Sequence, residues 1–298
     1  MSGTKDIGFI GLGLMGHGMA KNLIEKGHRL FILGRNNRKP IESLVARGAT
    51  EVSSPAELAR RTEIVFTCVS TSADVEEKVY GPEGLLENAR PGFVHIDCTT
   101  ADPTSTLKIA ADYQARGMVL VDAALARSPE HAEAGTLNLI VGAEADLLDR
   151  LRPVLDCVAE NIFHVGRTGA GHRTKLINNF IAMGSASLIA DAISAARATG
   201  VDLKALYDLI SAGGVNSPMF QIMALSALDG DTSRLKFSIA NARKDIRYFS
   251  DMVNEAEAIS LFGPAVLQAL TQAVLAGGKD EFVPHLGVVL TRMNDKTV

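Results

Sequence analysis

The chain of 298 residues has no tryptophan, few other aromatic residues and only three cysteines. These cysteines, Cys68, Cys98 and Cys157, lie far apart and are odd in number, so they supply neither a disulfide framework nor the ligand spacing of a metal site. Cys68 and Cys98 stand in apolar runs, which is typical of small core residues. We therefore expect no metal cofactor and a reducing compartment, the cytoplasm.

An excess of positive charge is also absent. The chain has 30 lysines and arginines against 34 aspartates and glutamates, a formal net charge of -4. A protein with this balance has no overall field that would attract nucleic acid or an anionic membrane surface. The longest apolar run, residues 176–192, is interrupted by Asn178, Asn179 and Asp191, and the first residues lack the regions of a signal peptide. We expect neither nucleic acid nor a membrane as a partner.

Near its start the chain contains a short apolar run, a glycine-rich turn, a helical pattern and a second strand-like run. This order within about 30 residues is the context in which a Gly-x-Gly-x-x-Gly turn binds a dinucleotide. Gly11 would allow the tight turn, Gly13 the approach of a pyrophosphate, and Gly16 the packing of helix on strand. The alternative is a purely structural turn. The predicted cofactor contacts are Gly11, Leu12, Gly13, Leu14, Met15 and Gly16.

The end of the second strand-like run bears on the choice between NAD and NADP. An acidic residue there would hold the ribose 2′-hydroxyl of NAD, but residues 33–39 contain three cations and no carboxylate. Arg35 could bond a 2′-phosphate through its two-pronged guanidinium, with Asn36 beside it. We predict that NADP(H) is preferred and NAD(H) possible. The alternative is a solvated basic turn.

Strand-like and helical patterns alternate through the first half of the chain, which predicts a doubly wound, mainly parallel sheet in a domain of residues 1–167. Ligands of such sheets lie beyond the carboxyl ends of the strands. We expect Val69, Ser70 and Thr100 to contact the cofactor there and Thr99 the substrate, although a single hydroxyl at such a place is more often a helix cap. The expected strands are residues 7–10, 30–33, 63–69, 93–98, 118–123, 137–142 and 162–165.

The second half, residues 168–298, has only helical patterns, so we predict a second, all-helical domain. Its first pattern is long and starts with a glycine-rich stretch that leads into Lys175, Asn178 and Asn179. A lysine at the mouth of a buried helix is costly unless it has a function, and these spacings place both amides on its face. The alternative is a solvated lysine. The expected helices are residues 175–199, 202–211, 218–228, 238–257, 261–276 and 283–296.

A later helix carries a polar stripe at spacings of three, four and seven residues, which includes Lys244 and Asp245. One reading is a solvated surface pair. The other is that Lys244 reaches the cofactor or the substrate.

Together these features resemble the β-hydroxyacid dehydrogenase family, the group that contains the 3-hydroxyisobutyrate dehydrogenases and is similar to 6-phosphogluconate dehydrogenase. The resemblance covers nearly the whole chain. It implies a Rossmann domain joined by a long helix to an all-helical domain, through which members form homodimers or homotetramers. The motifs that carry it are Gly8–Gly16, Asp97–Thr100 with Pro103, Asp122–Ala123, Gly135–Leu137, Gly169–Asn179 and Lys244–Asp245.

The resemblance also implies the chemistry. Hydride would move between a nicotinamide and the carbon that bears the hydroxyl or aldehyde oxygen. Lys175 matches the catalytic lysine that exchanges a proton with this oxygen, and Asn179 matches the amide that orients substrate or lysine. Asn178 is a second choice for a substrate contact and Lys244 for a cofactor contact.

The chain departs from the family after Asp122-Ala123. Members usually continue there with a proline and Val-Ser-Gly-Gly, which holds the substrate carboxylate, but Arg127 and Ser128 stand in place of the two glycines. The sulfolactaldehyde reductases, a branch of the family, are similar at this place. Because a guanidinium can bond two oxygens at once, Arg127 and Ser128 suggest a bulkier or doubly negative group on the substrate. Alternatively, Arg127 faces solvent or pairs with Glu130 or Glu133, and Ser128 caps a turn.

We therefore expect an NAD(P)-dependent oxidoreductase that interconverts a small, anionic β-hydroxyacid and its aldehyde. A first alternative is a reductase of a sulfonated or bulkier acidic aldehyde. A second is an enzyme similar to the imine reductases, which generally lack the lysine. A third is a nucleotide-binding protein without catalysis.

Overall fold

The computed structural model describes residues 3–294 of the chain. It divides into two compact units, one that ends at Lys175 and one that begins at Leu176. The two predicted halves, a sheet-containing one and a helical one, are both present. The limits predicted for them, residues 1–167 and 168–298, stay a prediction.

The first unit is built on one eight-stranded sheet with the strand order β3-β2-β1-β4-β5-β6-β7-β8. All neighbouring strands are parallel except β6 and β7, which are antiparallel, so the predicted doubly wound, mainly parallel sheet is confirmed. The strands are β1 Asp6–Ile10, β2 Arg29–Leu33, β3 Thr50–Val52, β4 Ile64–Thr67, β5 Val94–Asp97, β6 Val119–Ala126, β7 Leu137–Gly142 and β8 Ala159–Gly166.

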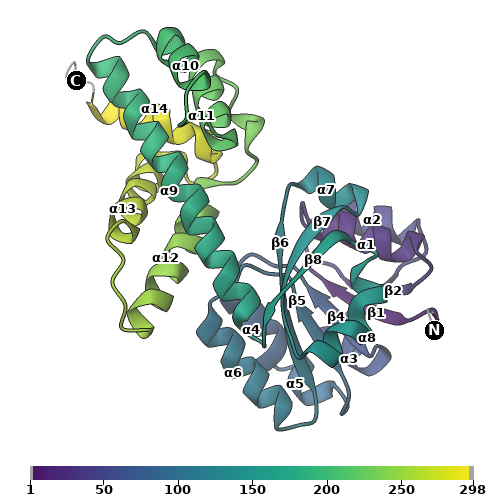
Figure 1. The fold of residues 1–298 in the computed structure, drawn as a ribbon. Coiled ribbons are helices and arrows are strands. Elements are labelled where there is room, and N and C mark those ends of the chain that lie inside the picture. The colour runs from purple at the N-terminus through teal and green to yellow at the C-terminus, as the bar shows by residue number, and fades with distance from the viewer. Residues whose placement is uncertain (1–2, 295–298) are drawn as a thin grey trace. The chain divides into compact units, whose positions relative to one another are not determined.

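Helices cover both faces of this sheet (Figure 1). Successive side chains of a strand point to opposite faces, so Phe66 packs in one core and Val65 in the other. The first core lies under α1, α2, α7 and α8, and the second under α3 to α6. The helices are α1 Gly16–Glu25, α2 Arg38–Val45, α3 Pro55–Arg61, α4 Ser72–Tyr80, α5 Leu85–Asn88, α6 Pro103–Gln114, α7 Pro129–Ala134 and α8 Ala145–Leu155.

One strand escaped sequence analysis. β3 has only three residues, and the first two, Thr50 and Glu51, are exposed, so neither a buried run nor a full alternation marks it. It forms because Phe31, Ile32 and Leu33 of β2 offer a free edge with which it pairs in parallel.

In the second unit every described element is helical, apart from an isolated bridge between Ser238 and Phe282. The expected helix 261–276 ends in a π-turn in which Gly277 has a φ of +91°, and residues 295–296 of the last expected helix lie outside the described residues. After α9 come α10 Leu203–Ser211, α11 Pro218–Asp229, η1 Thr232–Arg234, α12 Ile239–Glu255, α13 Gly263–Ala273, η2 Val274–Gly278, η3 Val283–His285 and α14 Leu286–Asn294.

Helix α9, Ala170–Ala198, is the 29-residue element that runs from the first unit into the second. By length and composition it is apolar enough to cross a membrane, a test that the core helix of a soluble protein also passes. Its Met183, Ala186 and Ala190 are buried in the core of the second unit against Ile246 of α12 and other apolar side chains. Packing within the second unit therefore accounts for part of its apolar character, while Ile177, Ile181 and Leu188 stay exposed.

Candidate active site

The turn after β1 has the geometry that its glycines predict. Gly11 has a φ of +97°, and a Cβ there would lie 2.2 Å from the carbonyl oxygen of Cys68. A Cβ on Gly16 would lie 1.9 Å from the carbonyl oxygen of Gly11, whereas one on Gly13 would meet no heavy atom within 4 Å. Gly11 and Gly16 are thus required by packing, and the backbone at Gly13 faces open space.

Helix α1 begins directly behind this turn. Its N-cap residue, Met15, makes no side-chain hydrogen bond to the first turn. The amide groups at a helix N-terminus and the positive end of the helix dipole attract an anion. The turn and the helix together fit the pyrophosphate of a dinucleotide.

The basic stretch after β2 is not uniform. The guanidinium of Arg38 donates two hydrogen bonds, of 2.7 and 2.8 Å, to the carboxylate of Glu51 on β3 in a bidentate ion pair. Arg35 and Asn36 are exposed, and the side chain of Arg35 makes no hydrogen bond or ion pair within residues 3–294. A Cβ on Gly34 would lie 2.7 Å from Glu51 Oε1, so this carboxylate stands at the end of β2. The sequence stretch itself contains no acid. Tertiary pairing brings Glu51 to the end of β2, but both of its carboxylate oxygens are engaged by Arg38.

The predicted residues at the ends of β4 and β5 lie close together. The backbone N–H of Val69 donates to the hydroxyl of Thr99 at 3.2 Å, and the N–H of Thr99 donates to Asp97 at 3.0 Å. Thr99 is 1 % exposed, so its hydroxyl joins the two strand ends. Ser70 is exposed and Thr100 half-buried, and both have interactions within the protein.

Beneath this rim lies a buried polar group that sequence analysis missed. Thr67 and Asp97 face each other in the register of β4 and β5. Nε2 of His95 contacts the hydroxyl of Thr67, and Nδ1 lies 3.2 Å from the hydroxyl of Tyr113. Burial, with the nearby His172, lowers the pKa of His95 to about 3, and burial raises the pKa of Asp97. His95 is therefore neutral at physiological pH, and both of its ring nitrogens have partners within the first unit.

The segment after β6 holds the two predicted anion-binding residues. Arg127 has a φ of +83°, and its guanidinium donates to the carbonyl of Thr136 at 2.7 Å and pairs with Glu160 of β8. Its side chain keeps 29 % of its surface exposed. Ser128 is the N-cap residue of α7 without a capping bond, and its hydroxyl lies 2.9 Å from Nδ1 of His131.

Glu133, one of the partners considered for Arg127, is held elsewhere. It contacts Nδ1 of His17 at 2.7 Å and Nζ of Lys21 at 3.2 Å. That part of the alternative for Arg127 is wrong. The carboxylate that faces Arg127 is Glu160, which lies 33 residues along the chain and on another strand.

Lys175, Asn178 and Asn179 all lie on α9, with Lys175 half-buried in the second turn. The side-chain amide of Asn178 donates to Oδ1 of Asn179 at 3.2 Å. Asn179 in turn donates to Oδ2 of Asp245 on α12 at 2.6 Å. The orientation of Asn179 is thus set by a buried carboxylate.

Lys244 and Asp245 form an ion pair of 3.1 Å in which the side chains are only 11 % and 2 % exposed. The ammonium of Lys244 also lies 5.3 Å from the ring centre of Tyr248. The reading of this pair as a solvated surface pair is therefore wrong.

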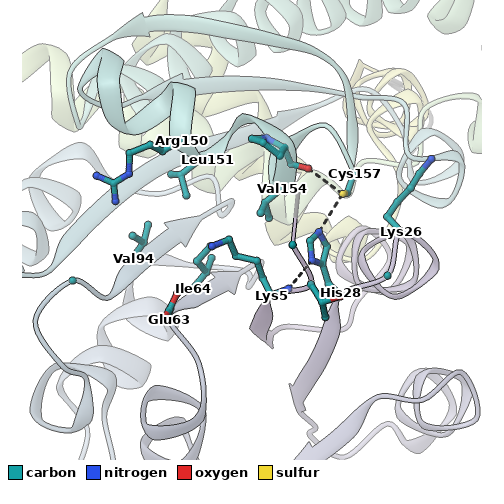
Figure 2. A pocket seen from close by; sticks show the side chains of 15 residues that line it. Lys5, Lys26, His28, Glu63, Ile64, Val94, Arg150, Leu151, Val154 and Cys157 are labelled. Atoms are coloured by element: carbon teal, nitrogen blue, oxygen red, sulfur yellow. Dashed lines mark hydrogen bonds between the residues drawn. The ribbon is translucent and has the colours of Figure 1, made fainter. Parts of the chain in front are cut away.

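A cavity of about 520 Å³ lies at the amino-terminal ends of the parallel strands, with Lys5 and His28 in its wall (Figure 2). Sγ of Cys157 lies 3.6 Å from Nε2 of His28. Burial raises the pKa of the Cys157 thiol and lowers that of His28, so the two do not form a charged nucleophilic pair at neutral pH. The glycine turn and Arg127 stand at the other ends of their strands, so the cavity is separate from the predicted site.

Comparison with known proteins agrees with this geometry. Residues 6–166 match the family model for the NAD binding domain of 6-phosphogluconate dehydrogenase, and residues 169–284 match that for the NAD-binding region of NADP-dependent 3-hydroxyisobutyrate dehydrogenase. The chain is 31 % identical over 272 residues to 3-sulfolactaldehyde reductase of Escherichia coli (strain K12), with 91 % of each chain covered. The chain belongs to the β-hydroxyacid dehydrogenase family.

Two further relatives extend the comparison. The chain is 30 % identical over 274 residues to 2-(hydroxymethyl)glutarate dehydrogenase of Eubacterium barkeri, with 92 % of this chain and 89 % of the relative covered. The solved structure of 3-hydroxyisobutyrate dehydrogenase of Mycobacterium tuberculosis with L-serine matches with a TM-score of 0.86 and 26 % identity, over 97 % of this chain and 99 % of that one. The protein is an NAD(P)-dependent oxidoreductase that acts on CH–OH groups, as the sequence predicted.

Proposed function

We propose that this dehydrogenase interconverts a small, anionic β-hydroxyacid and its aldehyde, with Lys175 as the proton donor and acceptor. The observation that carries the proposal is the arrangement on α9. Lys175 is half-buried near the start of the helix, and Asn179, one turn further on, is fixed by Asp245. A catalytic group must be held in a defined orientation to act, and a buried amide–carboxylate bond provides this for Asn179.

The nicotinamide, when bound, supplies or accepts the hydride. The glycine turn and the N-terminus of α1 would hold the pyrophosphate of the dinucleotide. During reduction, the ammonium of Lys175 donates a proton to the alkoxide that develops on the substrate oxygen. Asn179 orients the substrate or the lysine, with Asn178 as a second substrate contact. In the oxidative direction Lys175 takes the proton back.

For the cofactor we propose a preference for NADP(H), with NAD(H) possible. Arg35 is the support, since it is exposed and has no partner among the described residues, whereas Arg38 is engaged by Glu51. A free guanidinium at this place suits a 2′-phosphate. Further proposed cofactor contacts are Asn36, Val69, Ser70, Thr100 and Lys244.

The substrate carries an anionic group, for which Arg127 and Ser128 are the proposed ligands. Thr99 is a weaker candidate because it is buried. A carboxylate is the first choice. A sulfonate or a second acidic group is the alternative. It is favoured by the partly exposed side chain of Arg127 and by two relatives that are named 3-sulfolactaldehyde reductase and 2-(hydroxymethyl)glutarate dehydrogenase. The anion would have to share Arg127 with Glu160.

The test is oxidation of NADPH against a panel of aldehydes: succinic, methylmalonate and tartronate semialdehydes and sulfolactaldehyde, with NADH in parallel. Lys175→Ala should abolish turnover and leave NADPH affinity unchanged. In an enzyme of the imine reductase type, which works without a lysine, the same substitution would leave turnover in place. Turnover of the sulfonate alone would favour the alternative. Lack of turnover with the whole panel and both cofactors would overturn the proposed substrate class.

We also propose that the enzyme is a homodimer or homotetramer of the cytoplasm. Ile177, Ile181 and Leu188 are spaced four and seven residues apart on α9 and are 49 %, 63 % and 71 % exposed. A row of large apolar side chains at helical spacing is suited to burial against a second copy of the chain.

A further inference from the structure

The first turn of α9 lacks a capping side chain of its own. The residue before the helix is Gly169, which has a φ of +92° and no side chain. The first amide groups of a helix have no partner within the helix and need one from elsewhere. Here the partner comes from another element of the first unit.

That partner is Asp122 in strand β6. Its Oδ1 accepts the backbone N–H of Gly169 at 2.7 Å, and its Oδ2 accepts the backbone N–H of His172 at 2.8 Å. Asp122 is completely buried. A carboxylate at this place also complements the positive end of the helix dipole.

The space around this carboxylate is shaped by two further glycines. A Cβ on Gly142 of β7 would lie 2.5 Å from Oδ1 of Asp122, and a Cβ on Gly171 would lie 2.8 Å from Oδ2. A Cβ on Gly171 would also lie 2.6 Å from the carbonyl oxygen of Ile140. The helix can approach the sheet this closely only because neither position has a side chain.

The first turn is held from a second direction as well. The hydroxyl of Thr106 on α6 lies 3.0 Å from the carbonyl oxygen of Asp102 and forms a 2.7 Å hydrogen bond with Nδ1 of His172. Backbone and side chain of His172 are therefore both anchored, and Lys175 follows His172 by one helical turn.

We propose that Asp122 is a positioning residue for Lys175: it fixes the start of α9 against β6 and thereby the place of the lysine at the site. The proposal rests on the proposed function of Lys175. Asp122 does not touch the substrate. It acts through the backbone of Gly169 and His172, and β6 continues from it to the proposed anion ligand Arg127.

The test compares Asp122→Asn, which keeps one acceptor oxygen, with Asp122→Ala, which keeps none. We expect kcat to fall in that order, by about 100-fold for Ala, because a displacement of about 1 Å at a catalytic group has an effect of this size. The Kd for NADPH should stay unchanged. The primary isotope effect on kcat with 4-deuterated NADPH should rise, because a misplaced proton donor slows the chemical step. A loss of stability alone would leave this isotope effect as it is.

Ser54→Ala is the matched control, since Ser54 is a buried cap of α3 that accepts the N–H of Glu57 at 3.3 Å and lies outside the proposed site. It should lower the melting temperature and leave kcat and the isotope effect unchanged. Gly142→Ala keeps the carboxylate but crowds it, so it should reproduce the kinetics of Asp122→Asn. It serves as the second test if Asp122→Ala fails to fold.

Two results would overturn the proposal. In the first, Asp122→Asn and Gly142→Ala both keep a kcat within about twofold of the wild type, while Lys175→Ala is inactive. This result would leave the proposed function of Lys175 intact. The other is unchanged amide hydrogen exchange of His172 in both variants. If the wild type itself has no turnover, the proposed function fails, and exchange at His172 decides whether Asp122 holds the helix.

Discussion

The side-chain amide of Asn179 donates a 2.6 Å hydrogen bond to the carboxylate of Asp245, and both residues are at least nine-tenths buried. Asp245 also pairs with Lys244, so one buried carboxylate holds a proposed catalytic amide and a proposed cofactor contact. This joins α9 and α12 within the second unit.

Asp245→Ala should therefore destabilise the protein strongly, because it leaves the ammonium of Lys244 and the amide of Asn179 buried without this partner. Removal of one member of a buried pair costs about 3–5 kcal/mol. Urea unfolding followed by circular dichroism measures it. Asp208→Ala, which breaks the exposed pair with Lys204, is the control and should change the midpoint little. Equal midpoints for the two variants would contradict the assigned role of Asp245.

Arg35→Ala should weaken NADPH binding about tenfold or more, since a charge-assisted bond to the 2′-phosphate is lost, and should leave NADH binding unchanged. Fluorescence titration with both cofactors gives the two constants. Arg47→Ala is the control. It removes another exposed arginine that follows β2 in the sequence but pairs with Glu25 at 3.0 Å, so it should change neither dissociation constant. Parallel losses for NADPH and NADH would argue against a 2′-phosphate contact.

Arg127→Ala should raise the KM for the anionic substrate about tenfold, because a guanidinium–anion bond is removed. Glu160→Gln should lower this KM, since it frees the guanidinium from its present partner. Steady-state kinetics on the preferred aldehyde separates these effects. A KM that does not respond to either change would mean that Arg127 only joins β6 to β8.

Leu188→Lys should shift the protein toward the monomer, because it places a charge in the exposed apolar row of α9. Light scattering coupled to gel filtration measures the mass. Val45→Lys, on α2 of the first unit and 44 % exposed, is the control and should keep the wild-type mass. A wild-type mass for Leu188→Lys as well would place the contact between copies elsewhere.

Much of the fold follows from local patterns in the sequence. The turn from Gly11 to Gly16 is recognisable because its conformation depends on the residues within it: Gly11 needs a positive φ, and Gly16 tolerates no Cβ. The alternation of strands and helices in the first unit and the run of helices in the second follow from the period of the apolar residues. The same logic drew attention to Lys175 and the two asparagines on one helical face.

What the sequence could not supply are the partners of these residues. Glu51 meets Arg38 only because β3 pairs with β2, and a three-residue strand leaves too little pattern to predict this. Arg127 meets Glu160 across the sheet, where the register of β6, β7 and β8 decides which side chains face each other.

The hold of Asp122 on α9 has the same origin. Gly169 and His172 lie 47 and 50 residues along the chain from Asp122, and they reach its carboxylate only after the sheet has assembled and Gly142 and Gly171 have left room for the helix. The sequence alone determined which side chains are suited to bind a dinucleotide and transfer a proton, because those properties are local. The tertiary structure decided which of them are engaged, buried or held in place, because contacts between distant residues depend on strand order and packing.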